Sequence, residues 1–498
     1  MEGGTSLPGK LRKQLESELG TLGPELESAL VTVLDASSEE EFYDAERGVR
    51  EHLARVADQA VGAVLKHKVS DPAFVQPAKE LMQSRAKASG VQMKSHGRLP
   101  TQVRLLGGTV IKFRTLKLLP VAPTRPGRKR GVGRRGESGS GVFPALAMLG
   151  IEGRSTPALR AEIAREFAES NSTAVARASL AERGLDVPHK TALRLAYLFA
   201  DRVLQRRETA LAEAAANPPE AGELAGKRVA VGIDGGRLRI RENPKAGRRN
   251  AKTGHRRYKA PWREPKVMTV YVVDEQGQKH PRHRTFLDAT MGDADEAMAL
   301  LIGHLRLLGA HNAEHVSLHG DGAAWIWGRS HEIPKALGLR PDQFTEVVDR
   351  YHAAEHLTEI SKLPRAWDDA ARTKWLKRGT QLLDAGRIED LLAHIKTMAV
   401  GRRGAAVRKA SSYFVTHTER MRYAHFRKAG LPIGSGAVES GVRRVVNLRM
   451  KGNSIYWLED HAEAILHLRS NLRAGRWDDL VRSSFKQPVW TPRTREAA

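Results

Sequence analysis

The spacing of hydrophobic and polar positions predicts helices, then a hairpin, in the first third of the chain. Residues 1–95 are polar with helical apolar spacing, as in LESELGTLGPELESALVTVL. Residues 101–119, TQVRLLGGTVIKFRTLKLL, alternate apolar and basic positions around a Gly-Gly turn, which predicts a β-hairpin. RPGRKRGVGRRGESGSG, at 125–141, predicts a basic loop. We therefore expect a helical region at 1–95 and a basic hairpin with an Arg/Gly loop at 96–145.

Three more helices are predicted within residues 146–215. ALRAEIAREFAE, STAVARASLAERG and LDVPHKTALRLAYLFADRVLQRR have helical spacing, and Pro188 suits the start of the last helix. A short helix, a turn with glycine and a second helix carrying Lys190 and Arg194 form the order of a helix-turn-helix, whose last helix enters a DNA major groove. Ordinary three-helix packing gives the same pattern, so both interpretations stay open. ANPPEAG, at 216–222, predicts a linker.

From residue 228 onward, strand and helix patterns follow one another. Three strands are predicted first, by RVAVGIDGGRLRI, KVMTVYVVDEQGQ and PRHRTFLDAT. A helix follows, then a strand with HVSLH, and then a strand that runs into a helix, FTEVVDRYHAAEHL. This is the element order of an RNase H-like fold. We expect an α/β class: an RNase H-like catalytic core at 225–355 and 431–475, interrupted by an all-α insertion at 356–430 and preceded by a mainly helical DNA-binding region. Residues 476–498 are expected to form a C-terminal tail.

Composition adds a strong positive charge and the absence of cysteine. The 498 residues include 82 Lys and Arg against 57 Asp and Glu, a formal net charge of +25. This excess indicates a polyanionic partner, because Lys and Arg that neutralise phosphates release counterions from nucleic acid. Without cysteine, disulfides, cysteine zinc sites and thiol catalysis are excluded. No apolar stretch reaches the roughly 18–20 residues of a membrane span, so we expect a cytoplasmic, nucleoid-associated protein.

Three carboxylates stand at the ends of predicted elements. Asp234 follows the apolar run VAVGI, Asp321 lies between two glycines after HVSLH, and Glu439 lies in the first turn of a helix behind Gly-Ser-Gly. Each alone is typical of a turn or of a helix start. In an RNase H-like sheet, however, the three would converge, and converging carboxylates need cations, of which oxygen ligands select Mg²⁺ or Mn²⁺. Two such ions about 3.5–4 Å apart support phosphodiester displacement.

A histidine motif supports a competing hypothesis. His352-Ala-Ala-Glu355-His356 has the H-x-x-E-H order of an inverted zinc-protease motif, with both histidines on one helical face. Glu439 follows His356 by 83 positions (439 minus 356) and would supply the third ligand of a zinc metallopeptidase. This hypothesis leaves the other two carboxylates and the basic charge without a role.

Five sequence blocks resemble a known family. The blocks resemble, in their order, the catalytic domain of DDE transposases from bacterial insertion sequences of the Kra type, relatives of the Mutator-like group. They are GIDGGRLRIR, YKAPWREPKVMTVYVVDE, HGDGAAWIW, VVDRYHAAEHL and PIGSGAVESGVRRVVNLRMKG. The likeness covers about 228–475. It implies that Asp234, Asp321 and Glu439 form the catalytic, metal-binding triad. It also implies an all-helical insertion before the final Glu.

The resemblance gives the histidine motif another role. Mutator-like transposases carry Cys or Asp, two residues and then His after the second catalytic Asp, and the stretch from Asp349 to His352 matches the Asp form. Asp349 and His352 are then accessory residues of the transposase site, although Asp349 also suits a structural position at a strand end. Many relatives carry a cysteine zinc ribbon in the N-terminal half. Since this chain has no cysteine, we expect the hairpin and the Arg/Gly loop to replace that module.

Basic residues near the triad are candidate DNA contacts. Residues 237–266 hold twelve Lys and Arg against two Glu, between the first two predicted strands; a solvated charged loop is the alternative. Two arginines follow Glu439 by four and five residues, on roughly its helical face. The candidate contacts are Arg237, Arg239, Arg248, Arg249, Arg256, Arg257, Arg443, Arg444, Lys190 and Arg194.

Together these features predict a DNA transposase that uses Mg²⁺ or Mn²⁺, as two ions. It would bind double-stranded DNA at the ends of its element, hydrolyse a phosphodiester and join the freed 3′-hydroxyl to target DNA. Bringing two ends together predicts a homo-oligomer on DNA. The alternative is a domesticated, catalytically silent DNA-binding protein, which the intact triad disfavours.

Overall fold

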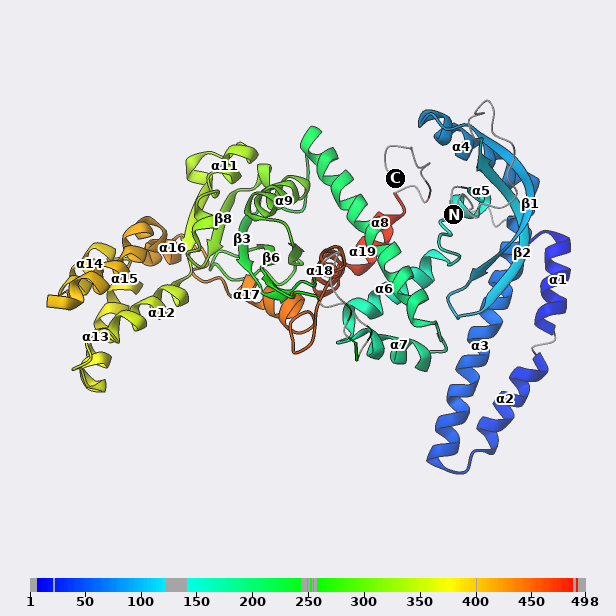
Figure 1. Ribbon diagram of the computed structural model, residues 1–498, viewed down its shortest axis with the longest axis horizontal. Helices are drawn as coiled ribbons and strands as arrows, with labels where there is room; N and C mark the ends of the chain where they lie inside the picture. Colours follow the sequence, from blue (N-terminus) through cyan, green and yellow to red (C-terminus); the bar gives the residue numbers. More distant parts are fainter. Residues whose placement is uncertain are drawn as a thin grey trace. The chain divides into compact units, whose positions relative to one another are not determined.

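The computed structural model describes residues 7–20, 23–121, 141–242, 249, 251–252, 254, 258–399, 401–486 and 490. The chain forms two compact units, one of Met1–Arg202 with Val481–Ala498 and one of Val203–Leu480 (Figure 1). The boundary lies inside helix α8, His189–Ala216, and not at the predicted linker, because the helix continues without a break to residue 216. Among the described helices, none combines the length and the apolarity that crossing a membrane requires.

The first unit begins with helices, as the polar pattern predicts. Its long helix α3 starts after Ser38, whose hydroxyl accepts a hydrogen bond from the Glu41 N–H, and carries acidic residues in its first turn and basic residues in its last. The helices are α1 Gly9–Gly20, α2 Gly23–Asp35, α3 Glu39–Lys68 and α4 Pro72–Ala88.

The predicted hairpin is present, and two backbone N–H groups hold its turn. Strands β1, Met93–Arg104, and β2, Val110–Pro120, pair antiparallel up to Arg104 and Val110. The carboxylate of Asp58 on α3 accepts hydrogen bonds from the N–H groups of Gly107 and Thr109, at 3.0 and 2.9 Å. The predicted Arg/Gly loop lies outside the described residues, except for its last position, Gly141.

The three predicted helices of the next region are also present, after a short additional one. The additional helix is α5, Pro144–Met148, and the predicted ones are α6 Pro157–Glu169, α7 Thr173–Glu182 and α8. Lys190 on α8 is exposed, whereas Arg194 donates a hydrogen bond to the carbonyl oxygen of Gly153 at 2.9 Å. The DNA-reading role of this helix therefore stays a prediction.

The second unit is built on a five-stranded mixed sheet, so the predicted α/β class is confirmed. The strand order is β7-β6-β3-β8-β9; β3 pairs antiparallel with β6 and parallel with β8 (Figure 1). Strands β6 and β7 are antiparallel, and β8 and β9 are parallel. The strands are β3 Arg228–Gly235, β6 Lys266–Val272, β7 Phe286–Thr290, β8 His315–Gly320 and β9 Phe344–Val348; β4 Leu238–Arg239 and β5 Trp262–Arg263 pair separately.

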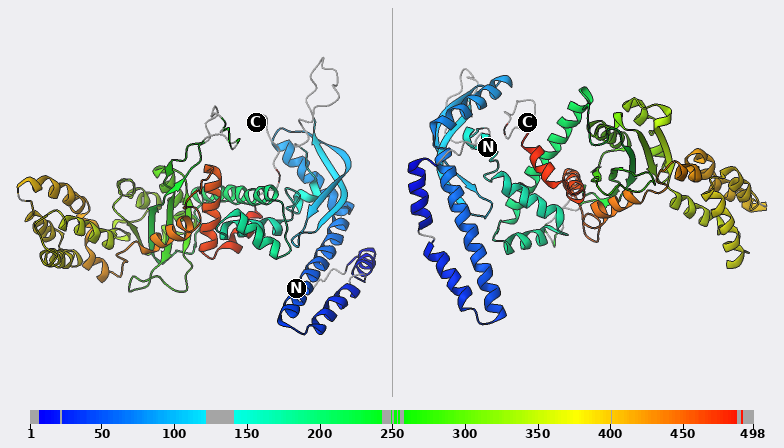
Figure 2. Two further views of the ribbon diagram at one scale, coloured as in Figure 1. Left: turned by 60° about the horizontal axis from the view of Figure 1, so that its bottom comes forward. Right: turned by 180° about the vertical axis from the view of Figure 1, so that it is seen from behind.

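Helices cover both faces of this sheet (Figure 2). Alternate residues of a strand point to opposite faces, so Val229, Val231 and Ile233 join one core with helix α9, Ala294–Leu307. On the opposite face lies helix α17, Gly436–Val442. A Cβ on Gly232 would lie only 2.9 Å from the Val438 Cβ, so the glycine permits α17 to pack closely on β3.

Helices fill the interval between β9 and α17, in agreement with the predicted insertion. They are α12 Arg350–Ser361, α13 Asp369–Asp384, α14 Ile388–Lys396, α15 Gly404–Thr416 and α16 Tyr423–Lys428. The first starts six residues before the predicted boundary at 356 (356 minus 350), because Asp349 caps it by accepting hydrogen bonds from the N–H groups of Tyr351 and His352. The short helices α10 Ala324–Trp327 and α11 Glu332–Leu337 lie between β8 and β9.

The prediction of a C-terminal tail at 476–498 is wrong for its first part. Helix α18, Glu459–Arg473, is followed by helix α19, Trp477–Ser484, in which Trp477 and Leu480 are buried. Arg476 makes a two-bond ion pair with Glu223, at 2.7 and 2.6 Å. Two apolar side chains three positions apart form a helical face, which explains why the segment packs.

Candidate carboxylate site

Asp234 lies at the end of the central strand β3, opposite Val267 of β6. Its position in the pleat places it on the same face as Gly232, the face on which α17 packs. The side chain is half-buried, and its Oδ1 accepts a hydrogen bond from the N–H of Gly235 at 2.6 Å. The carboxylate is thus held at one edge of the sheet, toward the helix that carries Glu439.

Asp321 directly follows β8, the strand that pairs parallel with β3, so both carboxylates lie at the same edge of the sheet. Its Oδ1 accepts a hydrogen bond from the Ala323 N–H at 2.8 Å, and its carbonyl oxygen accepts one from the Tyr413 hydroxyl at 3.3 Å. Gly322 has φ +131°, and a Cβ there would overlap the Tyr413 ring. Glycine is therefore required beside the second carboxylate.

Glu439 comes to this edge on α17, one residue after the Val438 that packs against β3. Its Oε1 accepts a hydrogen bond from the Ser435 hydroxyl at 2.9 Å. The same hydroxyl lies 2.5 Å from Oδ2 of Asp349, which also accepts from the Ser435 N–H. A carboxylate has more acceptor sites than this one hydroxyl can fill, so Glu439 keeps lone pairs for a cation.

Electrostatics shows that the three carboxylates are brought together. Burial, together with the smaller effect of the charges of Asp321, Glu439 and Glu264, raises the pKa of Asp234 to about 6, against the hydrogen bond from Gly235, which lowers it. Within the described part of the chain, no three or more His, Cys, Asp or Glu side chains lie close enough together to hold one metal ion. The three carboxylates are therefore near enough to influence one another's charge, but their oxygens do not surround one common point.

The donor chemistry fits a hard divalent cation. Asp234, Asp321 and Glu439 offer only carboxylate oxygens, the ligands that Mg²⁺ and Mn²⁺ prefer. A cation would also favour the ionised form of Asp234, whose pKa burial and like charges raise. In donor chemistry these residues suit such a metal, with Glu264 as an additional neighbouring charge, although in this arrangement their oxygens do not surround one point.

Glu264 is a site residue that the sequence did not single out. It stands just before β6, and its carboxylate lies over Gly235, where a Cβ would overlap it. Its side chain is half-exposed, and Lys266 is 3.4 Å away. The signal was available in the first two predicted strands of the α/β region, because antiparallel pairing places the start of the second strand beside the end of the first.

Asp349 has a structural position, which favours the strand-end interpretation over the accessory carboxylate. It is 1% exposed. Its Oδ1 caps α12, and its Oδ2 binds the backbone and side chain of Ser435. Every one of these bonds fixes the start of a helix, so Asp349 ties the end of β9 to the segment that precedes Glu439.

The histidines of the zinc motif have other neighbours. His352 lies 3.6 Å from Glu355 and meets the ring of His356 edge-on, with 5.2 Å between centroids. His356 stacks on Tyr413 at 3.9 Å. Since Glu439 is bound to Ser435 and the two histidines contact Glu355, Tyr413 and each other, the zinc hypothesis gains no support.

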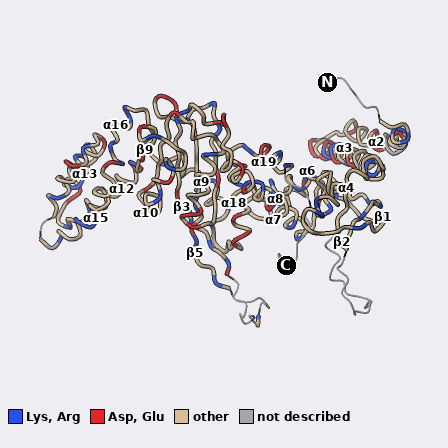
Figure 3. The backbone as a smooth tube through the Cα atoms, turned by 90° about the horizontal axis from the view of Figure 1, so that it is seen from above, with Lys and Arg blue, Asp and Glu red and all other residues tan. Residues whose placement is uncertain are grey.

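The predicted DNA contacts are only partly described. Arg237, Arg249 and Arg443 are exposed, whereas Arg239 lies over the Trp262 ring at 4.8 Å and Arg444 is half-buried. Lys and Arg are spread along much of the chain, including the segment of β4 and β5 that leads away from the sheet (Figure 3). Three of the predicted contacts lie outside the described residues: Arg248, Arg256 and Arg257.

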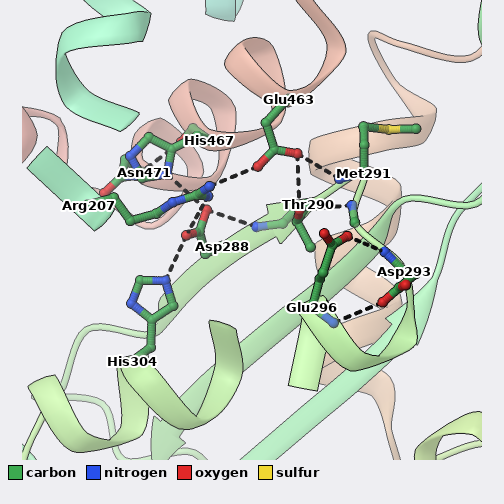
Figure 4. Close-up of polar contacts among 12 residues, drawn as sticks. Arg207, Asp288, Thr290, Met291, Asp293, Glu296, His304, Glu463, His467 and Asn471 are labelled. Carbon is green, nitrogen blue, oxygen red and sulfur yellow. Dashed lines mark hydrogen bonds and ion pairs between the residues drawn. The ribbon is translucent and has the colours of Figure 1, made fainter. Parts of the chain in front are cut away.

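A buried charge network next to the sheet edge was also missed. Asp288 on β7 is fully buried between Arg207 at 3.2 Å, His304 at 2.8 Å and His467 at 2.9 Å (Figure 4). Arg207 continues to Glu463 at 2.8 Å. Burial acts to raise the pKa of Asp288, but the charges of His467 and Arg207 hold it well below its usual value. The network joins α8, α9 and α18 to the strand.

Two members of this network also line a cavity of about 750 Å³. Arg207, Thr290 and Glu463 line it, and so does Glu264, which connects it to the carboxylate site. Comparison of the chain with protein-family models, with curated proteins and with solved structures gives no match.

Proposed function

We propose that this chain is a transposase that binds double-stranded DNA and cleaves and joins its strands with Mg²⁺ or Mn²⁺, held by Asp234, Asp321 and Glu439. The observation that carries the proposal is that these three carboxylates, from three separate elements, lie at one edge of the sheet. Burial, and after it the charges of the other two, raises the pKa of Asp234 to about 6. The resemblance of the five sequence blocks to DDE transposases supports the same residues.

The sheet topology supports an RNase H-like core. In chain order, the strands of the sheet lie third, second, first, fourth and fifth across it, with the first three antiparallel and the last two added in parallel. The central first strand and the adjacent fourth strand carry the two aspartates, and a late helix crosses the first strand with the glutamate. This is the arrangement that the predicted element order requires.

The protein groups have distinct tasks in the proposed reaction. Divalent ions, when bound, would activate a water or 3′-hydroxyl and stabilise the leaving oxygen. Asp234 and Asp321 stand on paired strands, so their spacing is set by the sheet. Glu439 is positioned by Ser435, which Asp349 holds in turn. Rigid placement of this kind is what metal-assisted strand cleavage needs.

Substrate binding is proposed to rest on exposed arginines near this edge. Arg443, four residues after Glu439, and Arg237, three after Asp234, are both exposed. Arginine side chains contact phosphates with two parallel hydrogen bonds, which fix the strand without reading its sequence. Since transposition brings two element ends together before their strands are joined to target DNA, we propose a homo-oligomer on DNA.

The test is nicking of a supercoiled plasmid that carries the DNA flanking the gene, with Mg²⁺ or Mn²⁺. The wild-type protein is compared with Asp321→Asn and with Asp342→Asn, a matched change at an exposed aspartate paired with Arg340. We expect metal-dependent nicking by the wild type and the control, and none by Asp321→Asn. DNA binding without nicking by all three proteins would contradict the enzyme and favour the domesticated DNA-binding protein.

A further inference from the structure

The connection between β6 and β7 forms a cationic pocket at a distance from the carboxylates. The pocket has a volume of about 470 Å³. Its charged lining consists of Lys279, Arg282, His283, Arg284, Arg444 and Arg473, and among the described residues no Asp or Glu lines it. We call this site the β6–β7 pocket.

The loop that supplies most of these cations has a defined shape. Asp274 accepts hydrogen bonds from the N–H groups of Gln276 and Gln278, at 3.0 and 2.8 Å, which closes a tight turn. The His280 N–H then returns to the Val272 carbonyl at 2.9 Å. The rings of His280 and His283 meet edge-on at 4.7 Å. Hydrogen bonds from backbone N–H groups thus fix the shape of the loop that carries Lys279, Arg282 and Arg284.

Several of the positive charges in the pocket have no compensating carboxylate. Arg284 pairs with Asp479 at 2.8 Å and is neutralised. Lys279 and Arg282 are exposed, and their side chains contact no partner among the described residues. Arg444 donates to two carbonyl oxygens, those of Ser440 and Arg473, which leave its charge in place. Like charges gathered in one hollow repel one another, and a bound anion relieves that repulsion.

The pocket lies toward the opposite end of the sheet from the carboxylate site but shares an element with it. Lys266, at the start of β6, pairs with Gly235, whereas Val272, at its end, pairs with Val229. Six residue steps along this strand are about 20 Å. The link between the two sites is Arg444, which lies in the π-helix Arg443–Asn447 directly after α17.

We propose that the β6–β7 pocket binds phosphate groups of a DNA backbone on the duplex that reaches the carboxylate site. This inference rests on the proposed function. At roughly 3.4 Å of rise per base pair, a duplex spans about 20 Å in six base pairs. Guanidinium and ammonium groups suit phosphate oxygens. The pocket would therefore set the register of the duplex without reading its bases.

The experiment measures binding of a 30-base-pair duplex by fluorescence anisotropy in EDTA, at several salt concentrations. The test protein is Lys279→Ala/Arg282→Ala, and the control is Lys335→Ala/Arg340→Ala, which removes two exposed cations elsewhere in the same unit. We expect the test protein to bind about tenfold more weakly than the wild type, and the control to bind like the wild type. The loss should be equal for duplexes of flanking and of unrelated sequence. The slope of log affinity against log salt concentration should be smaller by about two phosphate contacts.

Plasmid nicking separates this inference from the function on which it rests. If the test variant binds and nicks like the wild type while Asp321→Asn does not nick, the pocket assignment fails and the transposase stands. If the wild type never nicks but the test variant binds DNA weakly, the transposase proposal fails and the pocket assignment stands as a DNA-binding site. The wild type and the test variant are also titrated with inorganic phosphate. If the variant loses phosphate binding but binds the duplex like the wild type, the pocket is a free-phosphate site and the assignment is overturned.

Discussion

At the scale of single residues, the ionisation of Asp234 links stability to metal binding. Its folded-state pKa of about 6 lies above the usual 3.8, so its contribution favours folding at low pH and is lost as the pH rises through 6. At pH 7 the ionised carboxylate costs roughly 1–3 kcal/mol of stability, the lower figure allowing for solvent screening. We expect Asp234→Asn to stabilise the metal-free protein at pH 7 by that amount, and much less at pH 4.5, in urea unfolding.

Metal addition completes this test. Mg²⁺ should raise the unfolding midpoint of the wild type at pH 7, because a cation that binds only the folded state stabilises it. The same addition should leave Asp234→Asn nearly unchanged. A variant that is less stable than the wild type without metal would show that the carboxylate is a structural hydrogen-bond acceptor rather than a strained ligand.

Gly322 is the residue at which backbone shape limits the site. It combines φ +131° with a neighbouring Tyr413 ring that leaves no room for a Cβ. We expect Gly322→Ala to reduce the free energy of unfolding by about 2 kcal/mol or more. Denaturant titration should show little change for Gly436→Ala, since no heavy atom lies within 4 Å of a Cβ there. Equal effects of the two substitutions would mean that the backbone near Asp321 adapts freely.

At the scale of elements, the Asp288 network holds helices α8, α9 and α18 on strand β7. Asp288→Asn leaves buried cationic groups with a weaker partner. We expect a loss of about 3–5 kcal/mol in the free energy of unfolding, the range for breaking a buried charge pair. Asp295→Asn breaks only the surface contact with Arg329 and should change stability little. A small effect of Asp288→Asn would show that the network is replaceable by neutral hydrogen bonds.

The same network predicts a pH dependence. Burial lowers the pKa of His304 below 6.5, so the unfolded chain binds a proton there more readily than the folded protein does. Stability should therefore fall as the pH drops below 6.5, while the depressed pKa of Asp288 adds a further loss only below about pH 4. Thermal unfolding of Asp234→Asn between pH 8 and pH 4 measures this, because that variant lacks the opposite pH dependence that Asp234 gives the wild type. A melting temperature that rises from pH 7 to pH 5 would contradict it.

At the scale of the whole molecule, the net charge of +25 should dominate nucleic-acid binding. If about 6–10 phosphates are contacted, DNA affinity should fall by roughly 10³–10⁵ between 50 and 200 mM salt. Anisotropy titrations at four salt concentrations measure the slope. A slope near zero would contradict a binding mode based on phosphate contacts.

The sequence by itself determined the features that depend on near neighbours along the chain. The apolar run before Asp234 predicted β3, the Gly-Gly step predicted the hairpin turn, and helical spacing predicted the insertion between β9 and α17. Local spacing suffices there, because the side-chain period of a helix or strand is set by its own backbone. It failed at 476–486, where a helix of only eight residues buries just two of the apolar side chains, Trp477 and Leu480.

Only the tertiary structure decided which polar groups meet. Asp349 binds Ser435 across 86 positions, and Asp288 binds His467 across 179. In the sequence, each aspartate is an ordinary strand or strand-end residue. Burial turns it into the centre of a network, because a buried carboxylate must find partners and the fold alone decides which are near. The three carboxylates of the candidate site show both sides: their positions were predictable, but their common environment exists only after folding.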